Sequence, residues 1–275
     1  MASLVGAFLL PHVPLIGANP EAPPPEKRKI VHDAFAKVTQ RLRELAVDTV
    51  VIVGDDHYVL FGPQCLPRCL IGIGDVDGPV ENWINIERRA ISNDTSLAEH
   101  IMSFGMENGV DWSVSKTLTL DHSVMIPYHY AVSPCQDIKV VPIYLACAVE
   151  PFISSARARS IGKVTGDAIR SFPDARRVAV IGTGGLSHWV GMPQMGLVNE
   201  NWDRRALAHV MGNDLDALVA LKDEDVIAEA GNGALEIKNW ICAMAAAGDV
   251  RAELIAYEPV PQWVSGCGFV ELKVA

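Results

Sequence analysis

Short runs of β-branched and aliphatic residues alternate with longer segments of helical periodicity along this chain. Between the apolar runs Leu4–Leu10 and Thr49–Val53, apolar residues recur every three or four positions, which predicts an amphipathic helix over Glu26–Ala46. This alternation is typical of an α/β fold, in which helices cover both faces of a central sheet. We therefore expect a three-layer α/β/α sandwich around a mixed central sheet.

The same alternation extends to the end of the chain. The predicted strands are Leu4–Leu10, Thr49–Val53, Leu70–Ile73, Val140–Leu145, Arg177–Ile181, Leu254–Tyr257 and Gly268–Val274. The predicted helices are Glu26–Ala46, Ser96–Asn108, Ile153–Ser171, Trp202–Leu221 and Ala234–Ala247. The sequence shows no internal repeat, and its only linker-like stretch, residues 19–25, is followed at once by a helix. We expect residues 1–275 to form one domain.

The net charge and the cysteine pattern limit the kinds of function that the protein can have. A formal net charge of −10 and a pI near 5.2 argue against a nucleic-acid surface, because phosphate binding requires clustered Lys and Arg. The six cysteines form no C-x-x-C pair, which indicates reduced thiols in a cytoplasmic protein.

The apolar N-terminal stretch needs a separate interpretation. Residues 4–18 could imitate the apolar part of a signal peptide, but no Lys or Arg precedes them, and Pro11 and Pro14 interrupt them. A buried strand that runs into a loop fits better. No segment has the roughly 18 uninterrupted apolar residues that a membrane helix needs, so we expect no membrane association.

Three of the eight histidines follow predicted strands. His12 follows Leu4–Leu10, His57 follows Thr49–Val53, and His188 follows Arg177–Ile181. Ligands of open α/β sheets bind beyond the carboxyl ends of strands, so this edge is the expected site.

Two of these histidines and one acid form a candidate metal site. Two neutral imidazoles and one carboxylate on one face of a ferrous ion leave positions open for substrate and O₂, and His12, His57 and Glu236 could supply that set. We expect Asn232 to cap a helix whose first turn contains Glu236. Taken alone, however, such histidines are more often hydrogen-bonded structural residues, and such a glutamate is more often exposed.

The most distinctive motif is Gly182-Thr183-Gly184-Gly185-Leu186-Ser187-His188. It follows an apolar strand as a phosphate loop does, but it lacks the Lys-Ser/Thr ending of a P-loop and the full spacing of a dinucleotide-binding fingerprint. The glycines more plausibly let the backbone approach a ligand closely while presenting His188 to it.

These residues together resemble the class III extradiol ring-cleavage dioxygenases, whose type member is the large (beta) subunit of protocatechuate 4,5-dioxygenase. The resemblance covers nearly the whole chain. It depends on five motifs in the correct order: Pro11-His12-Val13-Pro14, Asp55-Asp56-His57, Asp121-His122, the glycine-rich run ending at His188, and Glu236 near Trp240.

The resemblance implies an enzyme that inserts both atoms of O₂ into a catecholic ring beside the diol, giving a hydroxymuconic-semialdehyde-type product. It implies Fe(II) bound by His12, His57 and Glu236, His188 as acid–base catalyst and His122 as a second catalytic histidine. It also implies a homo-oligomer or a complex with a small second subunit.

Departures from the family leave the pocket and the function partly open. Trp189 and the segment around Tyr128 differ from the type enzyme, and both residues could line the substrate pocket or fill the core. The sequence shows no Arg or Lys that is recognisable as the binding partner of a substrate carboxylate. Protocatechuate, gallate, an aminophenol and a plain or alkylated catechol therefore all stay open as substrates. The alternatives are a metal-binding module of the same fold without oxygenase chemistry, or a zinc hydrolase using the same three ligands.

Overall fold

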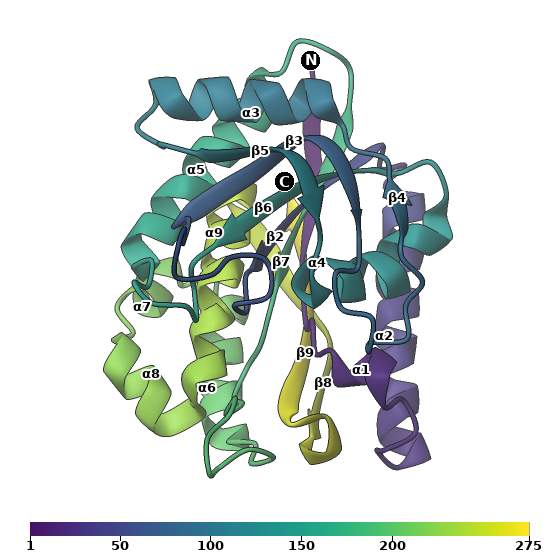
Figure 1. The fold of residues 1–275 in the computed structure, drawn as a ribbon, viewed down its shortest axis with the longest axis vertical. Helices are drawn as coiled ribbons and strands as arrows, with labels where there is room; N and C mark the ends of the chain where they lie inside the picture. Colours follow the sequence, from purple (N-terminus) through teal and green to yellow (C-terminus); the bar gives the residue numbers. More distant parts are fainter. Residues whose placement is uncertain (275) are drawn as a thin grey trace.

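The central strands carry buried side chains on both faces, as expected for a sheet between two helical layers. All seven residues of β2 (Thr49–Asp55) are buried, and so are all but the first of β7 (Arg177–Thr183). The computed structural model describes residues 1–274, and within them nine strands form one mixed sheet (Figure 1). The predicted three-layer α/β/α architecture is confirmed.

The strand order places four parallel strands at the centre of the sheet. β6, β2, β7 and β1 are parallel neighbours, β9 is antiparallel to β1, and β3 is antiparallel to β6. The full order is β4-β3-β6-β2-β7-β1-β9-β8, and β5 pairs with β3. Besides β2 and β7, the strands are β1 (Ser3–Leu10), β3 (Cys69–Gly78), β4 (Arg89–Ile91), β5 (Ser113–Thr119), β6 (Lys139–Leu145), β8 (Val250–Val260) and β9 (Ser265–Val274).

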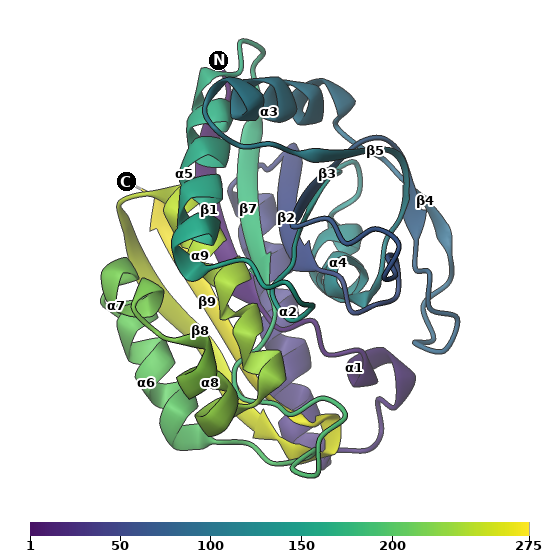
Figure 2. The same ribbon diagram turned by 60° about the vertical axis from the view of Figure 1, so that its left-hand side comes forward.

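The helices divide between the two faces of the sheet. One layer contains α3 (Thr95–Glu107), α5 (Ser155–Ser171), α9 (Ile237–Ala247) and, further out, α6 (Glu200–Met211), α7 (Leu215–Val219) and α8 (Asp223–Ala230) (Figure 2). The other contains α1 (Leu15–Ala18), α2 (Pro25–Glu44), α4 (His122–Pro127) and the π-helical turn Tyr128–Val132.

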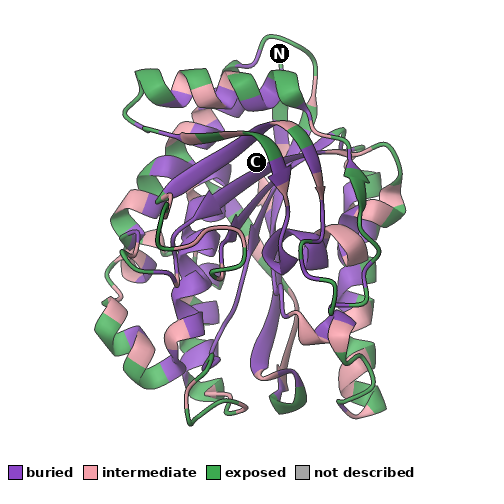
Figure 3. Ribbon diagram, viewed as in Figure 1, coloured by how far each residue is buried: buried purple, intermediate pink, exposed green. Residues whose placement is uncertain are grey.

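Alternate residues of the central strands therefore enter two different cores. Val51 and Val53 pack with α5 and α9, whereas Val50 and Ile52 pack with α2 and α4. Figure 3 shows the resulting buried centre, with exposed positions on the outer faces of the helices, in the loops and on strands at the edges of the sheet.

One predicted helix is wrong. The segment Trp202–Leu221 forms two helices, α6 and α7, instead of one. Asn213 between them has a positive φ of 52°, which a helix cannot include, and the Asp214 side chain accepts a hydrogen bond from Ala217 N to start the second helix.

The sheet is larger than the sequence predicted. β4 and β5 were not expected, because their sequences lack a clear apolar run. Six of the seven residues of β5 are exposed or partly exposed. The predicted strands Leu70–Ile73 and Leu254–Tyr257 lie within longer strands, β3 and β8.

Two further expectations concern the thiols and the membrane. All six cysteines are free, in agreement with the prediction of reduced thiols. Within residues 1–274, no helix combines the length and the apolar character needed to cross a membrane.

The packing of α5 on α9 gives a test of the fold. A Cβ built on Gly166 would lie 2.2 Å from the Ala246 carbonyl oxygen, so Gly166→Ala must push the helices apart. We expect the free energy of unfolding to fall by about 1–3 kcal/mol, although alanine favours a helix over glycine by about 1 kcal/mol. Urea denaturation measures the change. Ser160→Ala on the exposed side of α5 is the control; equal stability of both variants would contradict the close packing.

Candidate active site

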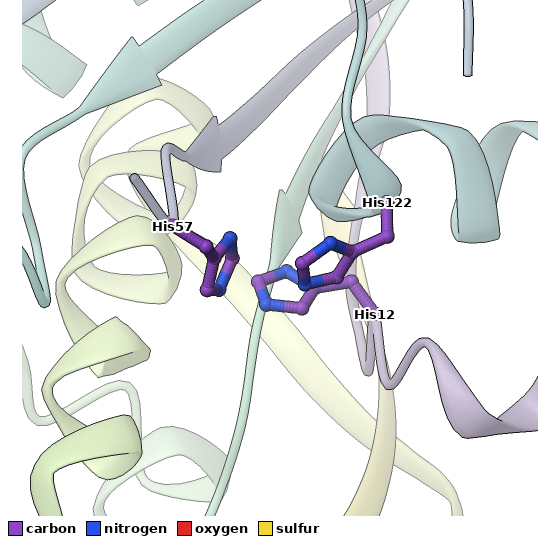
Figure 4. Close-up of side chains that lie close together, drawn as sticks. All are labelled: His12, His57 and His122. Atoms are coloured by element: carbon purple, nitrogen blue, oxygen red, sulfur yellow. The ribbon is translucent and has the colours of Figure 1, made fainter. Parts of the chain in front are cut away.

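The three histidines that follow strands lie at one edge of the sheet. His12 and His57 each stand two residues beyond β1 and β2, and His188 lies five beyond β7. Since these strands are parallel, their carboxyl ends meet, and the ring centroids of His12 and His57 are 5.1 Å apart. Figure 4 shows both rings with that of His122.

The Nε2 atoms of His12, His57 and His188 all lie close to the carboxylate of Glu236. Its Oε2 atom lies 3.1 Å from His12 Nε2, and its Oε1 atom lies 3.3 Å from Nε2 of both His57 and His188. The side chain is 1% exposed, so the expectation of an exposed first-turn glutamate does not hold. Burial raises the pKa of this carboxyl, but the charges of His12 and His188 outweigh burial and lower the pKa well below its usual range.

The local structure around Glu236 differs from the prediction. Residues Asn232–Glu236 form a 3-10 turn, and α9 begins after it, so Glu236 precedes the helix instead of lying in its first turn. Asn232 does not cap a helix. Its Oδ1 accepts from Val190 N at 2.8 Å and its Nδ2 donates to Val190 O at 3.1 Å, which ties the Glu236 segment to the His188 segment.

The tautomer of His12 follows from its neighbours. Thr183 Oγ1 lies 3.2 Å from Val53 O, a carbonyl that can only accept, so the hydroxyl donates there. The same oxygen, 3.0 Å from His12 Nδ1, must then accept the Nδ1 proton. His12 Nε2 is left with a lone pair and, among the described residues, is buried without a hydrogen-bond partner.

His57 is held in the same tautomer by a carboxylate. Asp121 Oδ2 accepts from His57 Nδ1 at 3.1 Å, and its Oδ1 accepts from Ser123 Oγ and Tyr144 Oη. Burial raises the pKa of Asp121, but the hydrogen bond from His57 and the nearby imidazole charges outweigh it and lower the pKa to about 2. Asp121 was predicted only as part of a motif, and its contact with His57 was not expected.

The two acids before His57 have separate roles. Asp56 Oδ1 accepts from the amides of Val59 and Leu60 and so caps the turn after His57. Asp55 Oδ2 lies 3.6 Å from His57 Nε2, and its Oδ1 accepts from Asn239 Nδ2. Burial lowers the pKa of His57, but Asp55, Asp121 and Glu236 together raise it well above its usual value.

His188 presents its Nε2 atom to the site. Its Nδ1 atom donates to the Leu186 carbonyl at 2.9 Å, so the neutral ring has no proton on Nε2. A Cβ on Gly233 would lie 2.0 Å from Nε2, which explains why glycine stands there. Burial lowers the pKa of His188, but Glu236 outweighs burial and raises it. The glycine-rich run contributes Gly185 N, which donates to Glu236 Oε2 at 2.8 Å.

A buried network fixes the segment that carries His188. Ser187 N donates to Asp203 Oδ1 at 2.7 Å, and Tyr257 Oη donates to Asp203 Oδ2 at 2.7 Å. Asn199 N donates to Ser187 Oγ at 2.7 Å. Sequence reasoning missed Asp203 and Tyr257, since nothing in their sequence context separates them from ordinary helix and strand residues.

The fourth histidine of the site, His122, begins α4. Its ring centroid lies 4.1 Å from that of His57 and 5.5 Å from that of His12 (Figure 4). Its ring is held by Glu81, whose Oε1 atom lies 2.6 Å from His122 Nδ1. Glu81 was not predicted, because it stands in a loop 41 residues away.

These side chains offer two overlapping donor sets for a metal ion. One is His12, His57, Glu236 and Asp55, and the other is His12, His57 and His122. The first set fits a divalent cation better, because the buried Glu236 carboxylate needs a countercharge and the lone pair of His12 Nε2 has no hydrogen-bond donor among the described residues. Two imidazoles and one carboxylate is also the donor set of non-haem iron(II) oxygenases.

The two predicted pocket residues, Trp189 and Tyr128, are not part of the cluster of site histidines. Trp189 is buried against Gly231 beside the His188 segment. Tyr128 begins the π-helical turn after α4, with the Arg89 guanidinium 5.4 Å above its ring. Neither ring forms an aromatic pair with a site histidine within residues 1–274, and the roles of both residues in the substrate pocket stay predictions.

Comparison with known proteins gives consistent matches over the whole chain. Residues 6–268 match the protein family described as the catalytic LigB subunit of aromatic ring-opening dioxygenase. Relatives named 2,3-dihydroxyphenylpropionate/2,3-dihydroxicinnamic acid 1,2-dioxygenase are 24% identical in both Photorhabdus laumondii, over 95% of each chain, and Rhodococcus jostii, over 96% of each chain. A crystal structure of an uncharacterized Escherichia coli K12 protein matches with a TM-score of 0.61 and 12% identity, over 97% of this chain and 99% of that chain, which shows the shared fold.

The Asp203 network gives a test of how the His188 segment is held. Tyr257→Phe removes the donor to a fully buried carboxylate, so we expect the free energy of unfolding to fall by about 1–3 kcal/mol. Urea denaturation measures the change. The control is Tyr58→Phe, at a tyrosine that is 56% exposed, for which we expect no measurable change. A stable Tyr257→Phe variant would show that the hydroxyl contributes nothing to this network.

Proposed function

Since the chain belongs to the family of the catalytic LigB subunit of aromatic ring-opening dioxygenase and is a ring-cleaving dioxygenase, we propose that it opens catechols beside the diol with Fe(II) as cofactor. In this proposal His12, His57 and Glu236 hold the iron, and His188 and His122 move protons. The resemblance seen in the sequence is confirmed by the family match, whereas the residue roles and the identity of the metal are our inference.

One observation carries the assignment of the ligands. Nε2 atoms of His12, His57 and His188 all point at one buried carboxylate, and each opposite Nδ1 atom has an acceptor. Acceptors on Nδ1 orient metal-bound imidazoles and raise their basicity. Thr183 and Asp121 would serve the two ligands in this way.

The residues also suggest how protons move. Bound Fe(II) would supply electrons for the activation of O₂ and a positive charge beside the catechol oxygens. His188 Nε2 lacks a proton in the neutral ring and can accept one from a catechol hydroxyl. His122, whose ring centroid lies 4.1 Å from that of His57, is the second candidate for proton transfer.

The substrate class follows from the relatives. The curated relatives are named for dihydroxyphenyl acids, and we propose a catechol for this chain as well, with no choice made among its ring substituents. All residues of the proposed metal site come from one chain, so the centre needs no ligand from a partner. Assembly into a homo-oligomer or with a small second subunit, and a cytoplasmic location, stay predictions.

Metal addition under anaerobic conditions tests the cofactor. Protein stripped of metal with a chelator should regain activity with Fe(II) and not with Zn²⁺, because only iron can pass electrons to O₂. The measurements are O₂ uptake and the colour of a semialdehyde product with a panel of catechol, 3-methylcatechol and 2,3-dihydroxyphenylpropionate. Ester or amide hydrolysis with Zn²⁺ and no O₂ uptake would favour a zinc hydrolase. Metal binding with neither O₂ uptake nor hydrolysis would favour the non-oxygenase module.

Two substitutions separate metal binding from proton transfer. His57→Ala removes a proposed ligand, so iron content and activity should be lost together. His188→Phe should keep the iron, while kcat falls by about 10²- to 10⁴-fold because the proton acceptor is gone. His100→Ala, on a histidine of α3 whose Nε2 atom bonds Ser171 Oγ, is the control and should leave both unchanged. Normal turnover by His188→Phe would show that another group takes the proton.

A further inference from the structure

Glu81 is a buried acid that the proposed function does not yet use. It lies in the loop after β3 and is 4% exposed. Its Oε1 atom lies 2.6 Å from the His122 Nδ1 atom and 3.3 Å from the His122 backbone N. A carboxylate that binds both the ring and the main chain of one residue fixes that residue strongly.

The loop holds Glu81 in this position through its own packing. Val80 N, adjacent to Glu81, donates to Leu120 O at 2.8 Å, which fastens the loop to the residue just before the Asp121-His122 pair. Ile84 and Ile86 are buried in the core on the α2 side. The loop is therefore built as an anchored segment, and Glu81 does not reach His122 by chance.

One carboxylate oxygen of Glu81 is not used for hydrogen bonding among the described residues. Within residues 1–274, Oε2 is buried and lacks a hydrogen-bond partner. A leucine or glutamine there would avoid the cost of a buried carboxylate, and unpaired buried polar atoms concentrate at functional sites. Retention of an acid at this position therefore needs a reason other than stability.

A second metal site is the first alternative. Glu81, Asp121 and His122 do lie close enough together to hold an ion. However, Asp121 already accepts from His57, Ser123 and Tyr144, and Glu81 Oε1 already contacts His122 Nδ1. These donor atoms are engaged with one another, so the cluster is better explained as a hydrogen-bond network.

We propose that Glu81 is the positioning residue for His122. Its carboxylate accepts the Nδ1 proton and fixes the ring, which leaves Nε2 of His122 to face the rings of His12 and His57 (Figure 4). His122 then meets the substrate with one defined nitrogen. This inference rests on the proposed function, in which His122 transfers protons, and it adds the residue that orients that histidine.

Glu81 and Asp121 have the same role, because each carboxylate accepts a hydrogen bond from the Nδ1 atom of one histidine. Asp121 fixes His57 through Nδ1, and Glu81 fixes His122 through Nδ1, although the two imidazoles lie in contact. Separate acceptors keep the rings from sharing one carboxylate. His57 can then serve as a ligand while His122 keeps its orientation.

A double-mutant cycle tests whether Glu81 acts through His122. Glu81→Leu removes the acceptor and should lower kcat by about 10- to 100-fold, as for other residues that orient a catalytic or ligand imidazole, with little change in KM or iron content. In a His122→Ala background the same change should cost less than about threefold, because residues that act through one another are not additive. A full multiplicative loss in that background would overturn the proposal.

Conservative and control variants guard against simple misfolding. Glu81→Gln keeps an amide oxygen as acceptor and should stay within about fivefold of the wild type in kcat, a modest loss for a hydrogen bond that loses its charge. Glu87→Leu changes an exposed acid of the same loop and should have no effect. If Glu81→Gln loses as much as Glu81→Leu, acceptance of the Nδ1 proton is not the role of Glu81.

A spectroscopic measurement does not depend on activity. In metal-free protein with ¹⁵N-labelled histidine, His122 should show a downfield Nδ1 proton resonance that is retained in Glu81→Gln and lost in Glu81→Leu. The same resonance in Glu81→Leu would overturn the proposal even if the enzyme is active. Failure of the wild-type protein to consume O₂ with catechols would instead count against the proposed function. The resonance would still show whether Glu81 orients His122.

Discussion

The buried carboxylate of Glu236 is the constraint on which the site depends. A single negative charge removed from water is costly unless cations or donors surround it. Here one amide, Gly185 N, donates to it, and three imidazole Nε2 atoms converge on it around the place where the proposed cation would supply the countercharge. None of these groups is near Glu236 in sequence, so the arrangement exists only when the sheet is complete. Folding and the construction of the metal site are therefore one event.

The parallel centre of the sheet explains how distant residues meet. β1, β2 and β7 are neighbours, and each delivers one histidine to the same edge. The strands also deliver the groups that orient the rings: Thr183, the last residue of β7, bonds His12, which follows β1. Orientation of one strand's ligand by the adjacent strand makes the register of the sheet a determinant of the site.

The sequence alone predicted the elements whose signal is local. Apolar runs located the central strands, and the positions of His12, His57 and His188 after them predicted the edge where they meet. Glu81 and Asp203 could not be found in this way, because their partners are 41 and 16 residues away and their own neighbours carry no pattern. Asn232 was misjudged as a helix cap because its real partner, Val190, is identified only by the folded loop. The break between α6 and α7 was missed because a positive φ at Asn213 leaves no strong mark on hydrophobic periodicity.

The paired bonds between Asn232 and the main chain of Val190 have a mechanical consequence. They join the stretch ending at Glu236 to the stretch beginning at His188, whereas His12 and His57 are attached to the sheet. Thermal motion should therefore carry Glu236 and His188 together, as one body, against a stationary pair of imidazoles. Such motion would change the distance from Glu236 to His12 and His57 while its distance to His188 stays constant.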